Sequence, residues 1–170
     1  RKESSAASDV YKRQEYWGQK GHYGVAILSK KKPTEVQKGF TKDTAEDQKR
    51  FIQAKFKWGK KSITIMNGYF PQGENRSHET KFPKKIKYYS DLKKHIKKTQ
   101  KTENNLIVMG DFNVAPSSLD IGIGEINAKR WLKEGKTAFL PEEIDMWNSI
   151  KDLGFIDSWR EQNPDEGSIY

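Results

Sequence analysis

The pattern of apolar and polar positions predicts a pair of antiparallel strands in the first half of the chain. Between Arg50 and Trp58 the residues alternate, so that one face of an extended segment is apolar. The residues of that face are Ile52, Ala54, Phe56 and Trp58. A turn at 59–60 and a returning apolar run over 62–69 complete a hairpin.

Two further apolar runs are continuous rather than alternating. Residues 23–29 are short and rich in Val, Ile and Leu, which favours a buried strand. Residues 106–109 read Leu-Ile-Val-Met, a pattern typical of a strand that is buried on both faces. A weaker strand is predicted over 36–40.

Helical spacing predicts one long helix, over 83–101, and two shorter helices. In the long helix the apolar positions recur every three to four residues. They are Ile86, Tyr89, Leu92 and Ile96. The shorter helices are predicted over 125–132 and from Leu140 to the stop at Gly154, with Ile144, Trp147 and Ile150 facing the core. Residues 155–159 are interpreted as the start of another strand. Intermixed helices and strands predict a layered α/β domain.

Residues 1–14 do not share these patterns. They show no period, and residues 9–14 resemble the translation of a sequencing adapter. We interpret 1–14 as a non-native or disordered segment and expect it to form no strand. The folded domain is therefore expected over 15–170, and that length suits a single domain.

Composition excludes several kinds of site. With no cysteine, the chain has no disulfides, thiolate nucleophiles or Cys-ligated zinc. Its three histidines stand at unrelated spacings, which argues against a metal site made of histidine alone. No apolar run approaches the roughly 18 residues that a membrane span requires, so we expect no membrane partner.

The charge is strongly positive and unevenly distributed. The formal net charge is +9, and residues 82–101 hold eight lysines and one aspartate, whereas residues 102–170 are acidic. An excess of positive charge suggests a polyanionic partner such as nucleic acid. The alternative is that the lysine-rich faces are simply solvated and bind no partner. For 82–101 we favour a solvated outer face. Carboxylates gathered in the acidic part would suit a divalent metal bound near phosphates.

The clearest candidate for chemistry follows the strand at 106–109. Asp111 and Asn113 are two residues apart, so their side chains would point the same way if the strand continues. A carboxylate and an amide oxygen can ligate a hard cation, or act as a base with an orienting partner. The alternative is a strand-end turn in which both side chains satisfy local backbone groups.

Two other segments are weaker candidates. Tyr69 ends the hairpin and offers a phenol that could donate to a phosphate or a metal-bound oxygen, although a packed aromatic with a wet tip is the simpler interpretation. Gly21, His22 and Tyr23 could approach a nucleic-acid groove closely, or form an ordinary glycine-rich loop.

Taken together, three blocks resemble the bacterial exonuclease III family. They are Gly-Gln-Lys-Gly-His-Tyr-Gly-Val-Ala at 18–26, Asn-Gly-Tyr-Phe-Pro-Gln-Gly-Glu at 67–74, and Gly-Asp-Phe-Asn at 110–113 followed by Leu-Asp-Ile-Gly-Ile-Gly-Glu at 119–125. Residues 129–132 and 139–143 fit as well. The resemblance covers 16–170, in order and with matching spacing.

The resemblance implies a four-layer α/β/β/α sandwich of the endonuclease/exonuclease/phosphatase superfamily, present here as an incomplete fragment. It implies a DNA repair hydrolase that uses Mg²⁺, or Mn²⁺, to cleave phosphodiesters in double-stranded DNA. The expected activities are a 3′–5′ exonuclease and an abasic-site endonuclease. We expect a cytoplasmic monomer.

The resemblance also implies roles for individual residues. Asp111 matches the carboxylate that positions or deprotonates the attacking water and also contacts metal. Asn113 matches its amide partner at the phosphate, a second candidate metal ligand, and Tyr69 matches the tyrosine at the scissile phosphate. The expected DNA contacts are Gly21, His22, Tyr23, Arg50 and Gln72.

Family members extend beyond both ends of this chain. An upstream Asn and metal-binding Glu, and a downstream Asp and Asp-His pair, have no match here, so we expect the chain alone to be inactive. Two other interpretations stay open at this point. One is a different phosphoesterase of the superfamily, and the other is a nonenzymatic basic module that binds nucleic acid.

Overall fold

A computed structural model describes residues 13–167 of the chain. These residues form two compact units. The first contains the described residues up to Tyr69 together with Lys98–Phe112. The second contains Phe70–Lys97 and the described residues from Asn113 onward.

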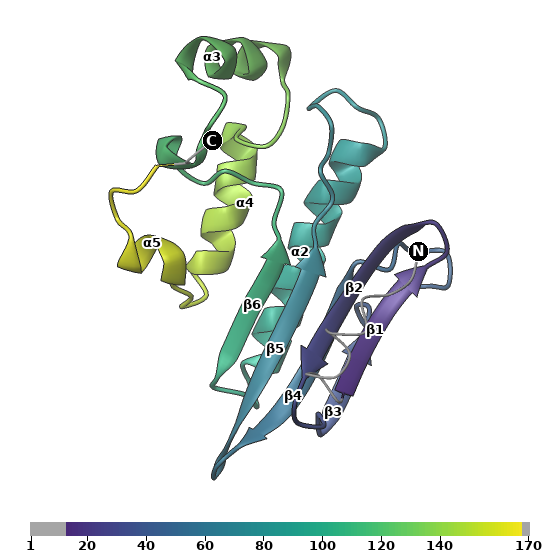
Figure 1. Cartoon of the computed structure of the whole chain (residues 1–170). Helices are drawn as coiled ribbons and strands as arrows, with labels where there is room; N and C mark the ends of the chain where they lie inside the picture. Colours follow the sequence, from purple (N-terminus) through teal and green to yellow (C-terminus); the bar gives the residue numbers. More distant parts are fainter. Residues whose placement is uncertain (1–12, 168–170) are drawn as a thin grey trace, which may run out of the picture. The chain divides into compact units, whose positions relative to one another are not determined.

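The first unit contains two β-sheets (Figure 1). One is the antiparallel pair β1 (Arg13–Gln19) and β2 (His22–Ser29). The other has the order β3-β4-β5-β6 and comprises β3 (Glu35–Lys38), β4 (Phe51–Trp58), β5 (Lys61–Tyr69) and β6 (Leu106–Asp111). Within it β6 runs parallel to β5, and the other pairs are antiparallel. The expected hairpin is confirmed as β4 and β5.

The two sheets of the first unit share a hydrophobic core. Its buried members come from β2 and β4, and they are Val25, Ile27, Ile52, Ala54 and Phe56. The alternating face predicted for β4 is thus confirmed for three of its four residues. Trp58 is the exception: it is 68% exposed at the end of the strand, and the Lys31 ammonium lies 5.6 Å from the centroid of its ring.

Strand β6 is more exposed than its apolar sequence predicts. Ile107 and Met109 are 43% and 47% exposed, so the expectation of burial on both faces is wrong. Within residues 13–167, β6 is the edge of its sheet and pairs only with β5. An edge strand has neighbouring side chains on one side only, and this leaves part of its apolar surface uncovered.

A glycine sets the spacing between β5 and β6 near their ends. Gly110 has φ of +129°, and a Cβ atom at this position would lie 1.9 Å from the carbonyl oxygen of Gly68. Only glycine allows the two backbones to approach this closely. The position immediately precedes Asp111, so the same constraint holds the end of β6 against β5.

The second unit is helical. It contains all but the last two residues of α2 (Lys81–Thr99), together with the short 3₁₀ turn Ser118–Asp120, α3 (Glu125–Glu134), α4 (Pro141–Lys151) and α5 (Ser158–Gln162). The three predicted helices are confirmed as α2, α3 and α4. None of the helices in residues 13–167 is both long and apolar enough to cross a bilayer.

The buried face of α2 differs from the predicted one. Tyr89, Leu92 and Ile96 are buried as expected, but Ile86 is 45% exposed. The helix instead buries Phe82, Lys85, Tyr88 and His95 on that side. The buried face of the helix is therefore rotated relative to the predicted face, because the rings of Tyr88 and Tyr89 both pack against Phe70. Their centroids lie 4.8 and 5.0 Å, respectively, from the centroid of the Phe70 ring.

In α4, Ile150 is buried, whereas Ile144 and Trp147 are half-buried. The expected strand over 155–159 is wrong. The Asp157 carboxylate accepts hydrogen bonds from the backbone N–H groups of Trp159 and Arg160, each at 3.1 Å, and so caps α5.

Strand β1 was not predicted, because its side chains are mostly polar and exposed. It includes Arg13 and Gln14, so the expectation that 1–14 forms no strand is wrong for these two residues. Residues 1–12 of that segment lie outside the described part of the chain.

Candidate functional site

Tyr69 and Asp111 stand opposite each other at the ends of β5 and β6. The two strands are parallel, and their register pairs Tyr69 directly with Asp111. Paired residues of adjacent parallel strands project from the same face of the sheet. Tyr69 is half-buried against the core between the sheets, and Asp111 is exposed. The first unit thus brings a phenol beside an accessible carboxylate.

Arg50 contacts the Tyr69 member of this pair. It is only 8% exposed, and its guanidinium carbon lies 3.9 Å from the centroid of the Tyr23 ring and 4.6 Å from that of Tyr69. One guanidinium nitrogen, Nη1, also donates to the Tyr69 carbonyl at 3.1 Å. Stacking a planar cation on two aromatic rings is favourable when water is excluded. Arg50 therefore fixes the ring of Tyr69 from one side.

The glycine-rich candidate segment forms the turn between β1 and β2. Gly21 has φ of +82° at that turn, and His22 and Tyr23 begin β2 rather than lying in a loop. The His22 and Tyr23 ring centroids are 6.0 Å apart, and those of Tyr23 and Tyr69 are 6.3 Å apart. The first unit accordingly gathers most of the candidate residues: Gly21, His22, Tyr23, Arg50, Tyr69 and Asp111.

The other two candidates, Gln72 and Asn113, belong to the second unit and line one pocket there. Its volume is about 370 Å³, and its wall includes the rings of Trp131 and Phe139. The Asn113 side-chain amide donates to the Phe70 carbonyl at 2.9 Å. The Gln72 amide donates to the Thr137 hydroxyl at 3.1 Å. Both side chains are thus held by local hydrogen bonds.

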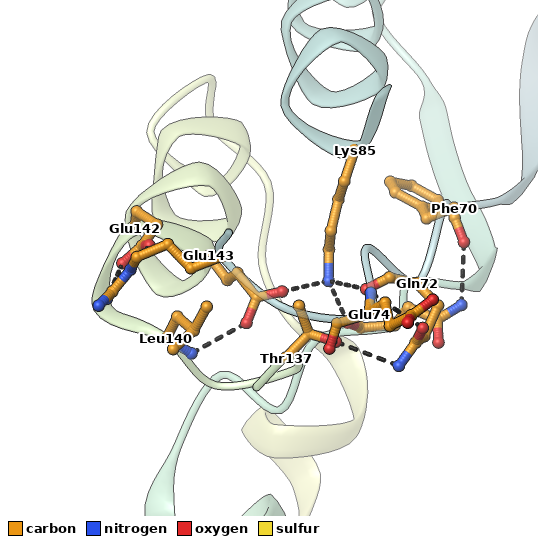
Figure 2. Close-up of polar contacts among 10 residues, drawn as sticks. Phe70, Gln72, Glu74, Lys85, Thr137, Leu140, Glu142 and Glu143 are labelled. Carbon is orange, nitrogen blue, oxygen red and sulfur yellow. Dashed lines mark hydrogen bonds and ion pairs between the residues drawn. The ribbon is translucent and has the colours of Figure 1, made fainter. Parts of the chain in front are cut away.

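A buried ion pair between Lys85 and Glu143 (Figure 2) contacts the backbone carbonyls of these two residues. Lys85 of α2 and Glu143 of α4 are both fully buried, and the Lys85 ammonium donates to a Glu143 carboxylate oxygen. Burial raises the pKa of Glu143, against the opposing effect of Lys85. The second Glu143 oxygen accepts a hydrogen bond from the Leu140 backbone N–H at 2.9 Å, which caps α4.

Sequence reasoning missed Lys85 and Glu143. Lys85 was counted among the solvated lysines of its helix, although it falls three residues after Phe82 and four before Tyr89 on the buried face. That spacing is the signal that could have identified it. For Glu143, the signal was its place three residues after Leu140, where a side chain can return to cap the helix.

The described residues do not form a complete Mg²⁺ site. The two predicted ligands, Asp111 and Asn113, would offer only one carboxylate and one amide oxygen, whereas Mg²⁺ requires near-octahedral oxygen coordination. Within residues 13–167, no group of three or more His, Asp or Glu side chains is placed to hold a metal ion. The roles assigned to all eight candidate residues stay predictions.

Comparison with known proteins gives matches over nearly all of the chain. Exodeoxyribonuclease III of Haemophilus influenzae is 50% identical over 147 residues, which are 86% of this chain and 55% of that protein. A DNA-(apurinic or apyrimidinic site) endonuclease of Dictyostelium discoideum is 28% identical over 153 residues, or 89% of this chain and 39% of that protein. The chain therefore spans about half the length, or less, of these relatives.

Solved structures show the same fold. The 3′-5′ exonuclease NExo from Neisseria meningitidis superposes with a TM-score of 0.80 at 26% identity, over 91% of this chain and 56% of that one. An AP endonuclease from Archaeoglobus fulgidus gives a TM-score of 0.77 at 29% identity, over 97% of this chain and 60% of that one. The expected α/β fold class is confirmed by these neighbours.

The model of the Endonuclease/Exonuclease/phosphatase family matches residues 5–167. This range contains every candidate residue discussed above. The resemblance inferred from the three sequence blocks is thereby confirmed, and the chain belongs to the endonuclease/exonuclease/phosphatase family.

Proposed function

We propose that this chain is part of a DNA repair nuclease of the exonuclease III type, which hydrolyses phosphodiester bonds in double-stranded DNA. The proposed activities are 3′–5′ exonuclease and cleavage at abasic sites. The observation that carries the proposal is the pairing of Tyr69 with Asp111 at adjacent strand ends. The 50% identity to an exodeoxyribonuclease III supports it.

In the proposed reaction, Asp111 aligns a water molecule and accepts its proton while the water oxygen attacks phosphorus. The phosphorus–oxygen bond to the leaving sugar oxygen then breaks, and that oxygen takes up a proton. The Tyr69 phenol donates a hydrogen bond to a phosphate oxygen, where negative charge accumulates. Asn113 contributes its amide at the same phosphate.

The proposed DNA contacts are the β1–β2 turn with His22 and Tyr23, together with Arg50 and Gln72. A chain with a net charge of +9 attracts a polyanion over long range. An abasic site lacks the stacking of an intact base pair, so extruding the sugar there costs less. This difference would favour abasic sites over intact duplex.

For the whole protein we propose Mg²⁺ as the cofactor, with Mn²⁺ as a substitute. Asp111 and Asn113 would supply two of its ligands, and the remainder would come from parts of the protein that this chain does not contain. When bound, the cation would offset charge on the phosphate. We further propose that the protein works as a monomer in the cytoplasm.

The test uses the product of the complete reading frame that contains this sequence, called the whole protein below. It is incubated with duplex DNA holding one abasic-site analogue, with Mg²⁺ or with a chelator. We expect Mg²⁺-dependent cleavage at the analogue, and little with an inositol phosphate or a lipid headgroup. Binding without cleavage would indicate a nonenzymatic module, and preference for the other phosphate esters would indicate a different phosphoesterase.

A further inference from the structure

Lys85 is a lysine in an unusual environment. It is fully buried, whereas its neighbours Lys84 and Lys87 on the same helix are exposed. A buried ammonium loses its hydration and must have its three N–H groups satisfied by protein acceptors. The acceptors around Lys85 therefore show which parts of the chain this residue holds together.

Three acceptors surround the Lys85 ammonium (Figure 2). One is the Glu143 carboxylate, and the other two are backbone carbonyls. The carbonyl of Asn113 lies 2.7 Å from the ammonium nitrogen, and that of Gln72 lies 3.2 Å from it. The ammonium thus joins the start of α4 to the segments that follow β5 and β6.

These two segments carry candidate functional residues. Asn113 has φ of +52°, in the left-handed region that asparagine adopts more readily than most other residues. Close packing also surrounds the lysine. A Cβ atom at Gly73 would lie 3.1 Å from Cδ of Lys85 and 3.1 Å from a Thr137 methyl. The backbone at Gln72 and Asn113 therefore has little freedom while Lys85 is in place.

We propose that Lys85, held by Glu143, is a positioning residue that fixes the backbones of Asn113 and Gln72 in the geometry required for phosphodiester cleavage. The proposal rests on the function proposed above. Hydrogen bonds from a charged donor are stronger than those between neutral groups, which suits a residue that must hold two segments in place. Small errors in such placement reduce the rate strongly.

The competing interpretation is that the ion pair serves folding alone. Removing one partner of a buried pair leaves an uncompensated charge, whereas replacing both partners by uncharged residues of similar size leaves none. The single variant Lys85→Met and the double variant Lys85→Met/Glu143→Gln therefore separate stability from positioning, because the uncharged glutamine keeps an oxygen that can accept from the Leu140 N–H. Lys84→Met, at an exposed site one residue away, is the matched control.

The experiment measures thermal stability, DNA affinity and single-turnover cleavage of an abasic duplex by the whole protein and its variants. We expect the double variant to regain most of the stability lost in Lys85→Met. We also expect its cleavage rate to remain about 100-fold below that of the unaltered protein, with DNA affinity little changed. The Lys84→Met control should cleave normally. Recovery of the cleavage rate together with stability would overturn the proposal.

A second readout does not depend on activity. With isotope-labelled asparagine, the side-chain amide resonances of Asn113 can be assigned by their loss in Asn113→Asp. We expect these resonances to shift in the double variant and not in Lys84→Met. If the whole protein cleaves no DNA, the proposed function fails, and this shift alone decides whether Lys85 orients Asn113. Unchanged resonances in the double variant would contradict the inference in either case.

Discussion

Tyr69 and Asp111 occupy directly paired positions at the ends of the parallel strands β5 and β6. The two residues are far apart in the sequence, and helix α2 lies between them along the chain. The parallel pairing of β5 and β6 therefore brings a hydrogen-bond donor beside a carboxylate. In the reaction proposed above, the phenol would act on the phosphate and the carboxylate on the attacking water.

Substituting Tyr69 by Phe tests the role of its hydroxyl. The phenylalanine ring preserves packing against Arg50 and Tyr23, so the free energy of unfolding should hardly change. If the hydroxyl stabilises charge on the phosphate, single-turnover cleavage by the whole protein should fall roughly 100-fold. Tyr16→Phe, at a 69% exposed position, is the control. Equal cleavage rates in the two variants would refute this role.

Arg50→Lys separates stacking from charge. Lysine keeps a positive charge for a DNA phosphate but lacks the planar group that stacks on Tyr23 and Tyr69. We expect the free energy of unfolding to fall by roughly 1–2 kcal/mol in denaturant titrations, because the desolvated stacking is lost. The salt dependence of DNA binding should be retained. Arg130→Lys, at an exposed position, is the control. If the two variants had the same free energy of unfolding, the stacking of Arg50 would make no contribution to stability.

The ion pair of Glu103 with Lys55 predicts a pH dependence of stability. The Lys55 ammonium lies 2.5 Å from Glu103, and together with the Ser62 hydroxyl it holds the pKa of Glu103 below its ordinary value of 4.5. A carboxyl with a lowered pKa stabilises the fold fully above its ordinary value. That contribution is lost as the pH falls through the lowered pKa.

Glu103→Gln should therefore reduce the loss of stability on acidification, measured by chemical denaturation at several pH values below neutrality. Glu46→Gln changes an exposed glutamate of the same unit and provides the comparison. If the free energy of unfolding of Glu103→Gln falls with decreasing pH as steeply as that of the unaltered chain, the ion pair makes no such contribution.

Much of the sheet framework could be predicted from the sequence because its signals are local. The hairpin of β4 and β5 follows from the alternating residues before Gly59 and the apolar run after it, and α2 follows from its apolar spacing. Strand β1 could not be predicted, because its mostly polar and exposed side chains do not give a pattern of alternating apolar and polar residues. The exposure of Ile107 in β6 also could not be predicted, because it depends on which neighbour a strand has.

The candidate site was only partly predictable for the same reason. Asp111 and Asn113 stand out because they follow a strand, but the pairing of Asp111 with Tyr69 depends on the register of distant strands. Burial of Lys85 contradicts the usual behaviour of lysine and depends on Glu143, which is 58 residues further along the chain. Local sequence patterns do not show that a buried charge is neutralised by a partner so far along the chain.

The 170-residue chain alone should bind DNA weakly and cleave it negligibly, since its described residues supply too few ligands for Mg²⁺. Binding measured by fluorescence anisotropy should weaken steeply with added salt, because contacts between lysine and phosphate release counterions. Efficient Mg²⁺-dependent nicking of an abasic duplex by this chain would show that its residues suffice for catalysis.

The central claim is that Asp111 acts on the attacking water, and Asp111→Ala in the whole protein tests it most directly. The measurement is single-turnover cleavage of an abasic duplex alongside DNA affinity, with Asp145→Ala at an exposed position of α4 as the control. We predict that Asp111→Ala slows cleavage roughly 100- to 10,000-fold and leaves affinity largely intact, while Asp145→Ala changes neither. Cleavage by Asp111→Ala at the rate of the unaltered protein would contradict the account.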